Sequence, residues 1–131
     1  MKKIMMFILV VSVLAVSPVV ASAATVEGSV QGFTCVTQGI TCPVGKEDPM
    51  AAAEKVFVVL SSEAAGKYYF VPNIDRAAMA RHINERVKVT GKLSEKYNSI
   101  TATKLEAWKN GIWVLVWTQK DQDRIMRKIG P

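Results

Sequence analysis

The segment from residue 85 to residue 108 constrains the fold most strongly, because its pattern is typical of two adjacent β-strands. In its first half, apolar or small residues alternate with polar ones, at Val87, Val89, Gly91 and Leu93. This two-residue period is that of a half-buried strand. A polar turn follows at residues 97–99, and a second β-type run extends from Ile100 to Trp108. We therefore expect an antiparallel hairpin, with a bulge near Thr103-Lys104 where the apolar alternation changes phase.

Residues 1–24 have the layout of a secretory signal peptide. A basic start at Lys2-Lys3 precedes the apolar run 4–16, and small residues follow at 21–24. This order predicts cleavage after an A-x-A site and export to the bacterial periplasm or beyond. The alternative is an uncleaved membrane anchor, but the apolar run is short for a membrane span. We expect no stable membrane insertion after cleavage.

The remaining chain is long enough for one small domain. We expect a barrel over residues 25–108 and a strand-helix extension over residues 109–131 that packs on it. Loss of Lys2 and Lys3 lowers the formal charge of +6 by two, to +4. So small a surplus mainly favours solubility, and with export it argues against a nucleic-acid partner.

The two cysteines, Cys35 and Cys42, flank a possible two-residue turn at Gln38-Gly39. Such a turn would place them opposite each other in a hairpin, at a separation that suits a disulfide. We expect a structural disulfide, as is common in exported chains. The alternatives are a redox-active pair, although the spacing is not C-x-x-C, or a metal site in which His82 is the one further soft ligand.

The other elements follow from local patterns. Strands are predicted at 25–33, 56–62, 67–71 and 112–117, the first of which carries glycines that allow a sharp bend or a close backbone approach. A short helix should begin with Asp48 as its N-cap. A second helix should run to about Asn84, capped by Asn73 or Asp75. A last helix, 119–129, should begin at a capping box formed by Thr118 and Asp121.

This order of elements resembles an OB-fold, a five-stranded Greek-key barrel with a helix between its third and fourth strands. The resemblance is carried by VEGSVQGF, VFVVLSS, KYYFVP, the helix at 74–84, RVKVTGKL and ITATKLEA. It is a resemblance to small exported bacterial proteins with OB-type barrels, and it implies ligand binding on the face of the central strands. Another small antiparallel barrel or a sandwich is the rival fold.

The sequence contains none of the common catalytic motifs, and the single His82 is expected to be structural. We expect a non-enzymatic, exported binding or accessory module without cofactor or metal; the alternative is a redox or metal-handling protein that uses Cys35 and Cys42. The candidate ligand-binding residues are Tyr68, Tyr69, Lys88, Lys92 and Tyr97. The alternative is that about half of the candidates fill the core, as alternation requires of either Tyr68 or Tyr69. Trp113 and Trp117, predicted on one side of their strand, either cover a barrel edge or contact a protein partner.

Overall fold

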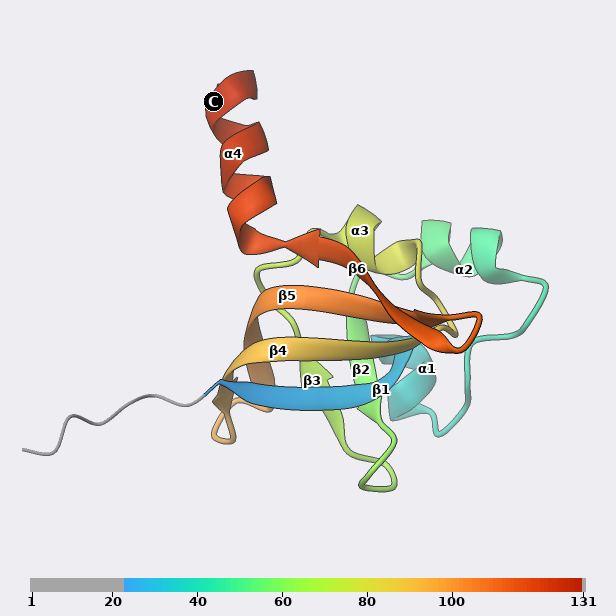
Figure 1. The fold of residues 1–131 in the computed structure, drawn as a ribbon. Helices are drawn as coiled ribbons and strands as arrows, with labels where there is room; N and C mark the ends of the chain where they lie inside the picture. Colours follow the sequence, from blue (N-terminus) through green and yellow to red (C-terminus); the bar gives the residue numbers. More distant parts are fainter. Residues whose placement is uncertain (1–22, 131) are drawn as a thin grey trace, which may run out of the picture.

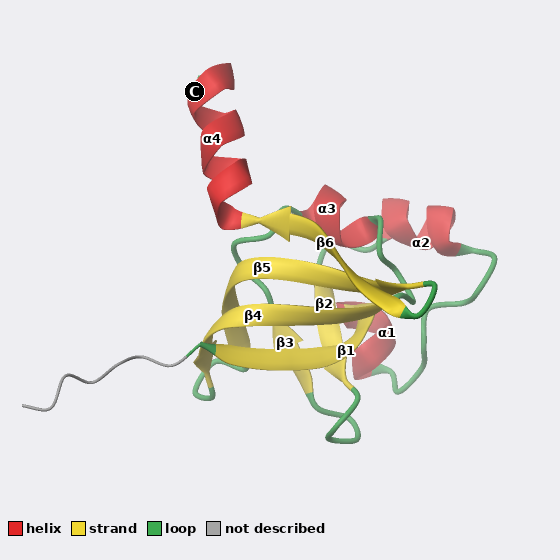
Figure 2. Cartoon of the chain, in the orientation of Figure 1, coloured by secondary structure: helices red, strands yellow, loops and turns green. Residues whose placement is uncertain are grey.

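The computed structural model describes residues 23–130, so the predicted signal peptide lies outside the described residues except for its last two positions. The strands are β1 (Ala24–Gly32), β2 (Phe57–Ser61), β3 (Tyr68–Phe70), β4 (Arg86–Ser94), β5 (Ser99–Lys109) and β6 (Ile112–Thr118). The helices are α1 (Phe33–Thr37), α2 (Glu47–Ala53), α3 (Arg76–Ala80) and α4 (Gln119–Ile129). Strands dominate, and the helices lie around them (Figures 1 and 2).

The six strands form one sheet in the order β3-β2-β1-β4-β5-β6, in which neighbours are antiparallel. A parallel pairing between Phe70 of β3 and Ser99 of β5 joins the first five strands into a barrel-like ring. Strand β6 continues the sheet outside this ring, on the far side of β5 (Figure 1). The chain after residue 111 therefore adds to the ring rather than completing it.

The core lies inside the ring and follows the alternation expected from the sequence. Its largest fully enclosed side chains come from four strands and are Val30, Val59, Val87, Val89, Ile100 and Leu105. On β4 the valines are buried, whereas Lys88 between them is only half-buried. The expected bulge is confirmed, because Thr90 pairs with Lys104 and Gly91 with Ala102, which leaves Thr103 without a partner. The hairpin prediction is therefore correct in both strands and in its irregularity.

Two glycines allow neighbouring strands to approach closely. A Cβ atom on Gly28 would lie 2.0 Å from the carbonyl oxygen of Leu60, and one on Gly91 would lie 2.0 Å from that of Thr101. Any larger side chain would have to displace backbone at these points. The expectation that the first strand admits another backbone is therefore confirmed at Gly28.

The helices differ from expectation mainly in their bounds. Helix α3 is capped by Asp75, whose carboxylate accepts a hydrogen bond from the Ala77 amide at 2.7 Å, as predicted. It ends at Ala80, and the chain reaches β4 through turns and Asn84, which has a φ of 63°. Helix α2 begins at Glu47 with Lys46 as its N-cap, so the prediction that Asp48 is the cap is wrong. Asp48 lies instead in the first turn, where the helix dipole favours an anion.

The cysteine segment forms a helix where the sequence predicted a hairpin. Gly39 does adopt a positive φ, of 70°, but it ends α1 rather than turning a hairpin. The Gly39 amide donates to the Val36 carbonyl and the Ile40 amide to the Cys35 carbonyl, the Schellman pattern of a helix end. At the other end, the carboxylate of Glu54 accepts from the amide and hydroxyl of Thr34. This long-range partner explains why local turn chemistry alone favoured the wrong structure.

Candidate functional site

The predicted ligand-binding residues do not share one face. Tyr69 points into the core and is 8% exposed, as alternation requires of one member of the tyrosine pair. Tyr68 points outward from β3, whereas Lys88 and Lys92 belong to β4, and β5 separates these two strands in the ring. Tyr97 is exposed in the β4–β5 turn, beneath the ammonium of Lys96. A combined tyrosine–lysine face is therefore not assembled.

Tyr68 belongs instead to an aromatic cluster on the outside of β3. Its ring contacts those of Phe33 and Phe70 edge-on, at centroid distances of 5.8 and 5.7 Å, and Phe33 and Phe70 lie 5.4 Å apart. Phe33 begins α1, so the cluster fastens this helix to the outside of the ring. Aromatic pairs at these distances add to the stabilisation that burial provides.

Cys35 of α1 and Cys42 of the following loop lie close together. Their sulfur atoms are 3.5 Å apart, and both residues are buried. The Cys42 sulfur accepts from the Gly32 amide at 3.1 Å, and the Cys42 amide donates to the buried Gln31 side chain at 2.7 Å. Asn84 in turn donates to the Cys42 carbonyl. The predicted pairing in space is present, but the sulfurs are not at the separation of about 2.05 Å that a disulfide has.

The surroundings of Cys35 favour its protonated thiol. Burial, the hydrogen bond with Cys42 and the charges of Cys42 and Glu54 together raise the pKa of Cys35 to about 11. Since the thiolate is the nucleophile and the metal ligand, Cys35 carries little reactivity at neutral pH. Within residues 23–130 there is no group of three or more histidine, cysteine or acidic side chains placed to hold a metal ion.

His82 has a structural partner. Its Nδ1 atom lies 2.7 Å from the Glu85 carboxylate, which also accepts a hydrogen bond from Lys109 at 3.2 Å. Burial alone would raise the pKa of Glu85, but its contacts with His82 and Lys109 outweigh burial and lower it. This network ties the turn after α3 to the end of β5.

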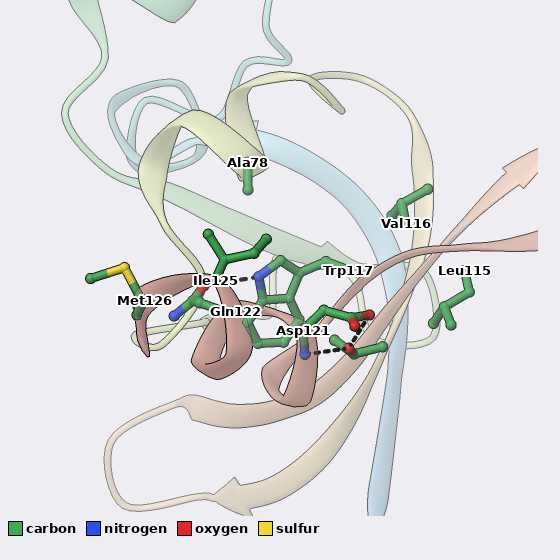
Figure 3. A pocket seen from close by; sticks show the side chains of 9 residues that line it. Ala78, Leu115, Val116, Trp117, Asp121, Gln122, Ile125 and Met126 are labelled. Carbon is green, nitrogen blue, oxygen red and sulfur yellow. Dashed lines mark hydrogen bonds between the residues drawn. The ribbon is translucent and has the colours of Figure 1, made fainter. Parts of the chain in front are cut away.

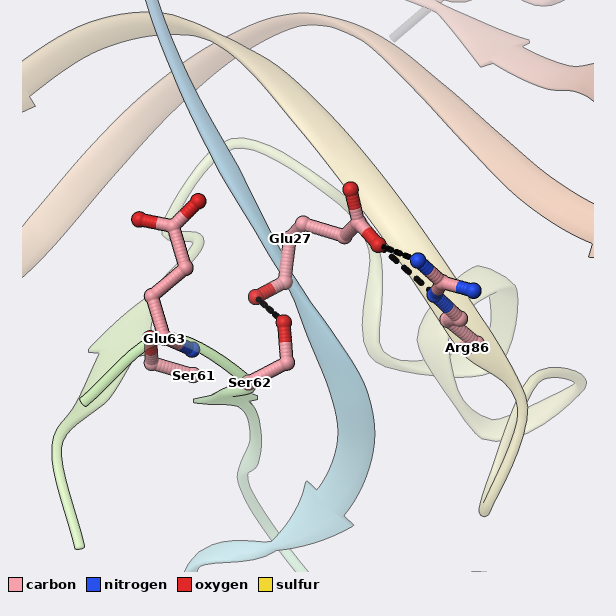
Figure 4. A network of polar contacts seen from close by, with 5 residues as sticks. All are labelled: Glu27, Ser61, Ser62, Glu63 and Arg86. Carbon is pink, nitrogen blue, oxygen red and sulfur yellow. Dashed lines mark hydrogen bonds and ion pairs between the residues drawn. The ribbon is translucent and has the colours of Figure 1, made fainter. Parts of the chain in front are cut away.

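A cluster of tryptophans and cations lies on the outer face of β4, β5 and β6. The Trp108 and Trp113 rings meet edge-on at 5.1 Å. The guanidinium of Arg86 lies 5.4 Å from each ring centre, and the Lys88 ammonium lies 4.1 Å from that of Trp113. Arg86 also pairs with Glu27 of β1 through its Nε atom at 2.6 Å (Figure 4). Arg86 therefore has both ring contacts and a carboxylate partner within the cluster.

Glu27 also has a backbone role in this region. Its carbonyl oxygen accepts hydrogen bonds from the hydroxyl and the amide of Ser62, each at 3.0 Å (Figure 4 shows the hydroxyl contact). The same residue thus joins β1 to the end of β2 through its backbone and to β4 through its carboxylate. These contacts hold β1, β2 and β4 together, and we assign them a structural role.

Trp113 and Trp117 lie on opposite faces of β6, so the prediction that they share one side is wrong. Trp113 pairs with Trp108 on the outer face, whereas Trp117 pairs with the fully buried Leu105. Register shifts by one residue between these pairs, because Val116 has no partner on β5. A bulge of this kind reverses the face of every later side chain. Trp117 consequently faces the core side, next to α4.

An open apolar groove lies between β6, α3 and α4 (Figure 3). Its volume is about 350 Å³ and its lining is mainly apolar. The residues that line it are Ala78, Leu115, Val116, Trp117, Thr118, Asp121, Gln122, Ile125 and Met126. The Trp117 indole N–H donates to the Gln122 side chain at 3.0 Å, which leaves the ring faces for apolar contact. We call this feature the β6–α4 groove.

Polar contacts at its first turn hold α4 in place. Thr118 caps the helix by accepting from the Asp121 amide at 3.0 Å, as the sequence predicted. The Asn73 side chain bonds both the amide and the carbonyl of Ala102 on β5, at 2.8 and 2.7 Å, and also donates to Gln119 at 2.6 Å. The groove therefore has one wall fixed to the ring near residue 119.

The rest of α4 extends away from the ring (Figure 1). No residue of this helix is buried. The stripe that the sequence assigns to its packed side is 51% exposed at Ile125, 57% at Met126 and 73% at Ile129. Leu115 of β6 is 55% exposed beside it. Sequence periodicity identified this stripe, but the pattern does not show that the ring leaves it uncovered.

No family model, curated protein or solved structure matches this chain. Among the helices at residues 23–130, none combines the length and the apolar character needed to cross a membrane. Any role for the groove or the cysteine pair must therefore be argued from their geometry alone.

Proposed function

We propose that this protein is an exported, non-catalytic binding module with an OB-fold-like barrel, which holds an apolar helical segment of a protein partner in the β6–α4 groove. The observation that carries the proposal is the uncovered apolar stripe of α4 beside a groove of about 350 Å³. Apolar concavities with a few fixed polar groups are the usual form of binding sites. Here Gln122 and Asp121 supply those polar groups.

The strand order supports the OB-fold-like assignment. Around the ring the strands run β1-β2-β3-β5-β4, with β3 and β5 parallel, and α3 lies between β3 and β4 in the chain. This order agrees with the Greek-key arrangement that the resemblance implies, and so it supports the proposal. The outer side of β3, where such barrels commonly bind ligands, is packed against α1 through Phe33. Because α1 covers that surface, we place the binding site in the β6–α4 groove instead.

Titration with anilinonaphthalene sulfonate, an apolar fluorescent dye, tests the groove. We expect dye fluorescence with the wild-type protein and a loss of several-fold for Leu115→Asp or Met126→Asp. Val44→Asp is the matched control, because Val44 is 85% exposed and belongs to the loop before α2. Equal dye binding by all four proteins would overturn the proposal, provided that their circular dichroism spectra agree.

We also propose that export converts Cys35 and Cys42 to a structural disulfide. The sulfurs need to approach by only about 1.5 Å from their 3.5 Å separation to bond. Thiol–disulfide exchange with a disulfide of an oxidising compartment would remove both protons and two electrons, which reduce that disulfide to two thiols. The raised pKa of Cys35 supports this structural role over a nucleophilic one.

Thiol counting on the exported protein tests the disulfide. We expect no titratable thiols after denaturation without reductant, and two after reduction. Two free thiols in the protein as exported would contradict the proposal. A bridge that mild reductant opened readily in the folded protein would favour the redox alternative instead.

A further inference from the structure

We propose that the occupant of the β6–α4 groove is helix α4 of a second copy of this chain, packed antiparallel in a two-fold symmetric dimer. The inference rests on the proposed binding function, because it names the partner of the same groove. It joins two features that the single chain leaves open, an apolar groove and an apolar helix stripe.

The stripe has the spacing that one helix presents to another. Gln122, Ile125, Met126 and Ile129 follow the i, i+3, i+4, i+7 pattern, which places them on one face. Helix α4 has 11 residues and is therefore about 16 Å long, enough for three turns of contact. In an antiparallel pair centred near Ile125, the stripe of each copy covers that of the other. Ile125 then meets Met126, and Gln122 meets Ile129.

Charges along α4 favour the antiparallel direction. Both of its acidic residues, Asp121 and Asp123, lie before the middle residue Arg124, whereas two of its four cations, Arg127 and Lys128, lie after it. A parallel pair would place like charges together, and an antiparallel pair places each acidic half over a basic half. The helix dipoles also oppose each other in that direction.

Asp121 and Lys128 form the most specific part of this match. They are seven residues apart, so both flank the stripe on the same side of the helix. In antiparallel helices the same flank of each partner faces the other, which brings Asp121 of one copy to Lys128 of the second. Asp121 is 52% exposed even with its Arg124 pairing in place, so it can accept this contact. The two-fold axis creates the contact twice.

The symmetry also closes the assembly. The same patch serves both copies, which gives a dimer rather than an open chain. Strand β6 strengthens the patch: within residues 23–130 it is hydrogen-bonded on one side only, to β5, and Ile112–Trp117 contains no charge or proline that would protect its edge. Because a single helix pair and a strand edge form a small interface, we expect a dissociation constant of about micromolar order.

Sedimentation equilibrium of the exported protein, from about 1 to 500 μM, tests the inference. We expect a monomer–dimer transition that Ile125→Asp weakens by at least tenfold, while Val44→Asp leaves it unchanged. Lys128→Glu should also weaken the dimer several-fold, since it places two carboxylates together. Arg127→Glu is its control, because it makes the same charge change one residue away on the opposite face of α4.

The outcomes separate the two proposals. A protein that stays monomeric, but whose dye binding still depends on Met126, would overturn the dimer and leave the binding function standing. A monomer whose dye binding ignores the groove would overturn both. A dimer that Ile125→Asp does not weaken would place the interface elsewhere and reject the inference. Equal effects of Lys128→Glu and Arg127→Glu would reject the antiparallel pairing.

Discussion

Reduction of the proposed Cys35–Cys42 bridge should produce a measurable loss of stability. The bridge would close a loop of eight residues, counted from Cys35 to Cys42. In the chain-entropy treatment such a loop removes about 8 cal/mol/K from the unfolded state, which is about 2.5 kcal/mol at 25 °C. The native state needs little adjustment, because the two sulfurs already lie 3.5 Å apart in a buried site. Most of this stabilisation should therefore survive in the folded protein.

The corresponding change in melting temperature follows from the size of the domain. Residues 23–130 should have an unfolding entropy of about 0.23 kcal/mol/K, so a loss of 2.5 kcal/mol corresponds to about 10 °C. Differential scanning calorimetry of the oxidised protein, with and without reductant, measures it. The variant Cys35→Ala/Cys42→Ala is the control, since reductant should not change its melting temperature.

Two results would refute this reasoning. An oxidised protein with a proven bridge that melts at the same temperature as the reduced protein would show that the bridge strains the native state. A similar shift in the double alanine variant would show that reductant acts elsewhere.

The pH dependence of stability adds a check on the reduced protein. Because the folded pKa of Cys35 is raised to about 11, its contribution to stability is complete below the unfolded value and disappears as pH rises towards 11.

Three further predictions concern the ring and its attachments. Gly91→Ala should cost at least about 1–3 kcal/mol in urea denaturation, because its Cβ would meet the Thr101 carbonyl at 2.0 Å; a cost near zero would contradict that approach. Asn73→Ala should cost about 1–3 kcal/mol by leaving Ala102 unpaired, and hydrogen exchange should become faster in α4; unchanged exchange would show that other contacts hold the helix. Wild-type protein should be more stable than Glu85→Gln above about pH 4.5, and this advantage should fade in acid as pH drops through the lowered pKa of Glu85; a pH-independent difference in melting temperature would exclude that ionic network.

The ring could be predicted from sequence because strand alternation is a local signal that tertiary packing reinforces. Val87 and Val89 are apolar at every second position and are fully buried. The phase change near Thr103 was readable for the same reason, since a bulge is the one way to keep both halves of β5 facing the core. Where the polarity of each residue indicates which face of a strand it occupies, the sequence is enough to predict the strand.

The cysteine segment shows where local reasoning fails. A Gly39 at positive φ suits either a hairpin turn or the end of a helix, and nothing nearby distinguishes them. The decision comes from Glu54, which lies 20 residues from Thr34 and bonds the start of α1. Such a contact has no periodic signature in the sequence.

The candidate site was only partly predictable for a related reason. Alternation places Trp113 and Trp117 on one side, and the bulge at Val116 that separates them has no clear signal in an apolar run. The α4 stripe was visible as periodicity, but exposure depends on whether another element covers it. Only the three-dimensional arrangement shows Ile125, Met126 and Ile129 uncovered.

The most direct test of the β6–α4 groove as a binding surface is an isotope-filtered NMR experiment on a mixed sample. One copy carries labelled methyl groups and the other is unlabelled, at a concentration that populates the dimer. The proposed dimer predicts intermolecular contacts from the Ile125 methyls to Met126 and from Leu115 to the facing α4, since these side chains line the groove. Intermolecular contacts confined to other surfaces, or none at all up to millimolar concentration, would contradict the account.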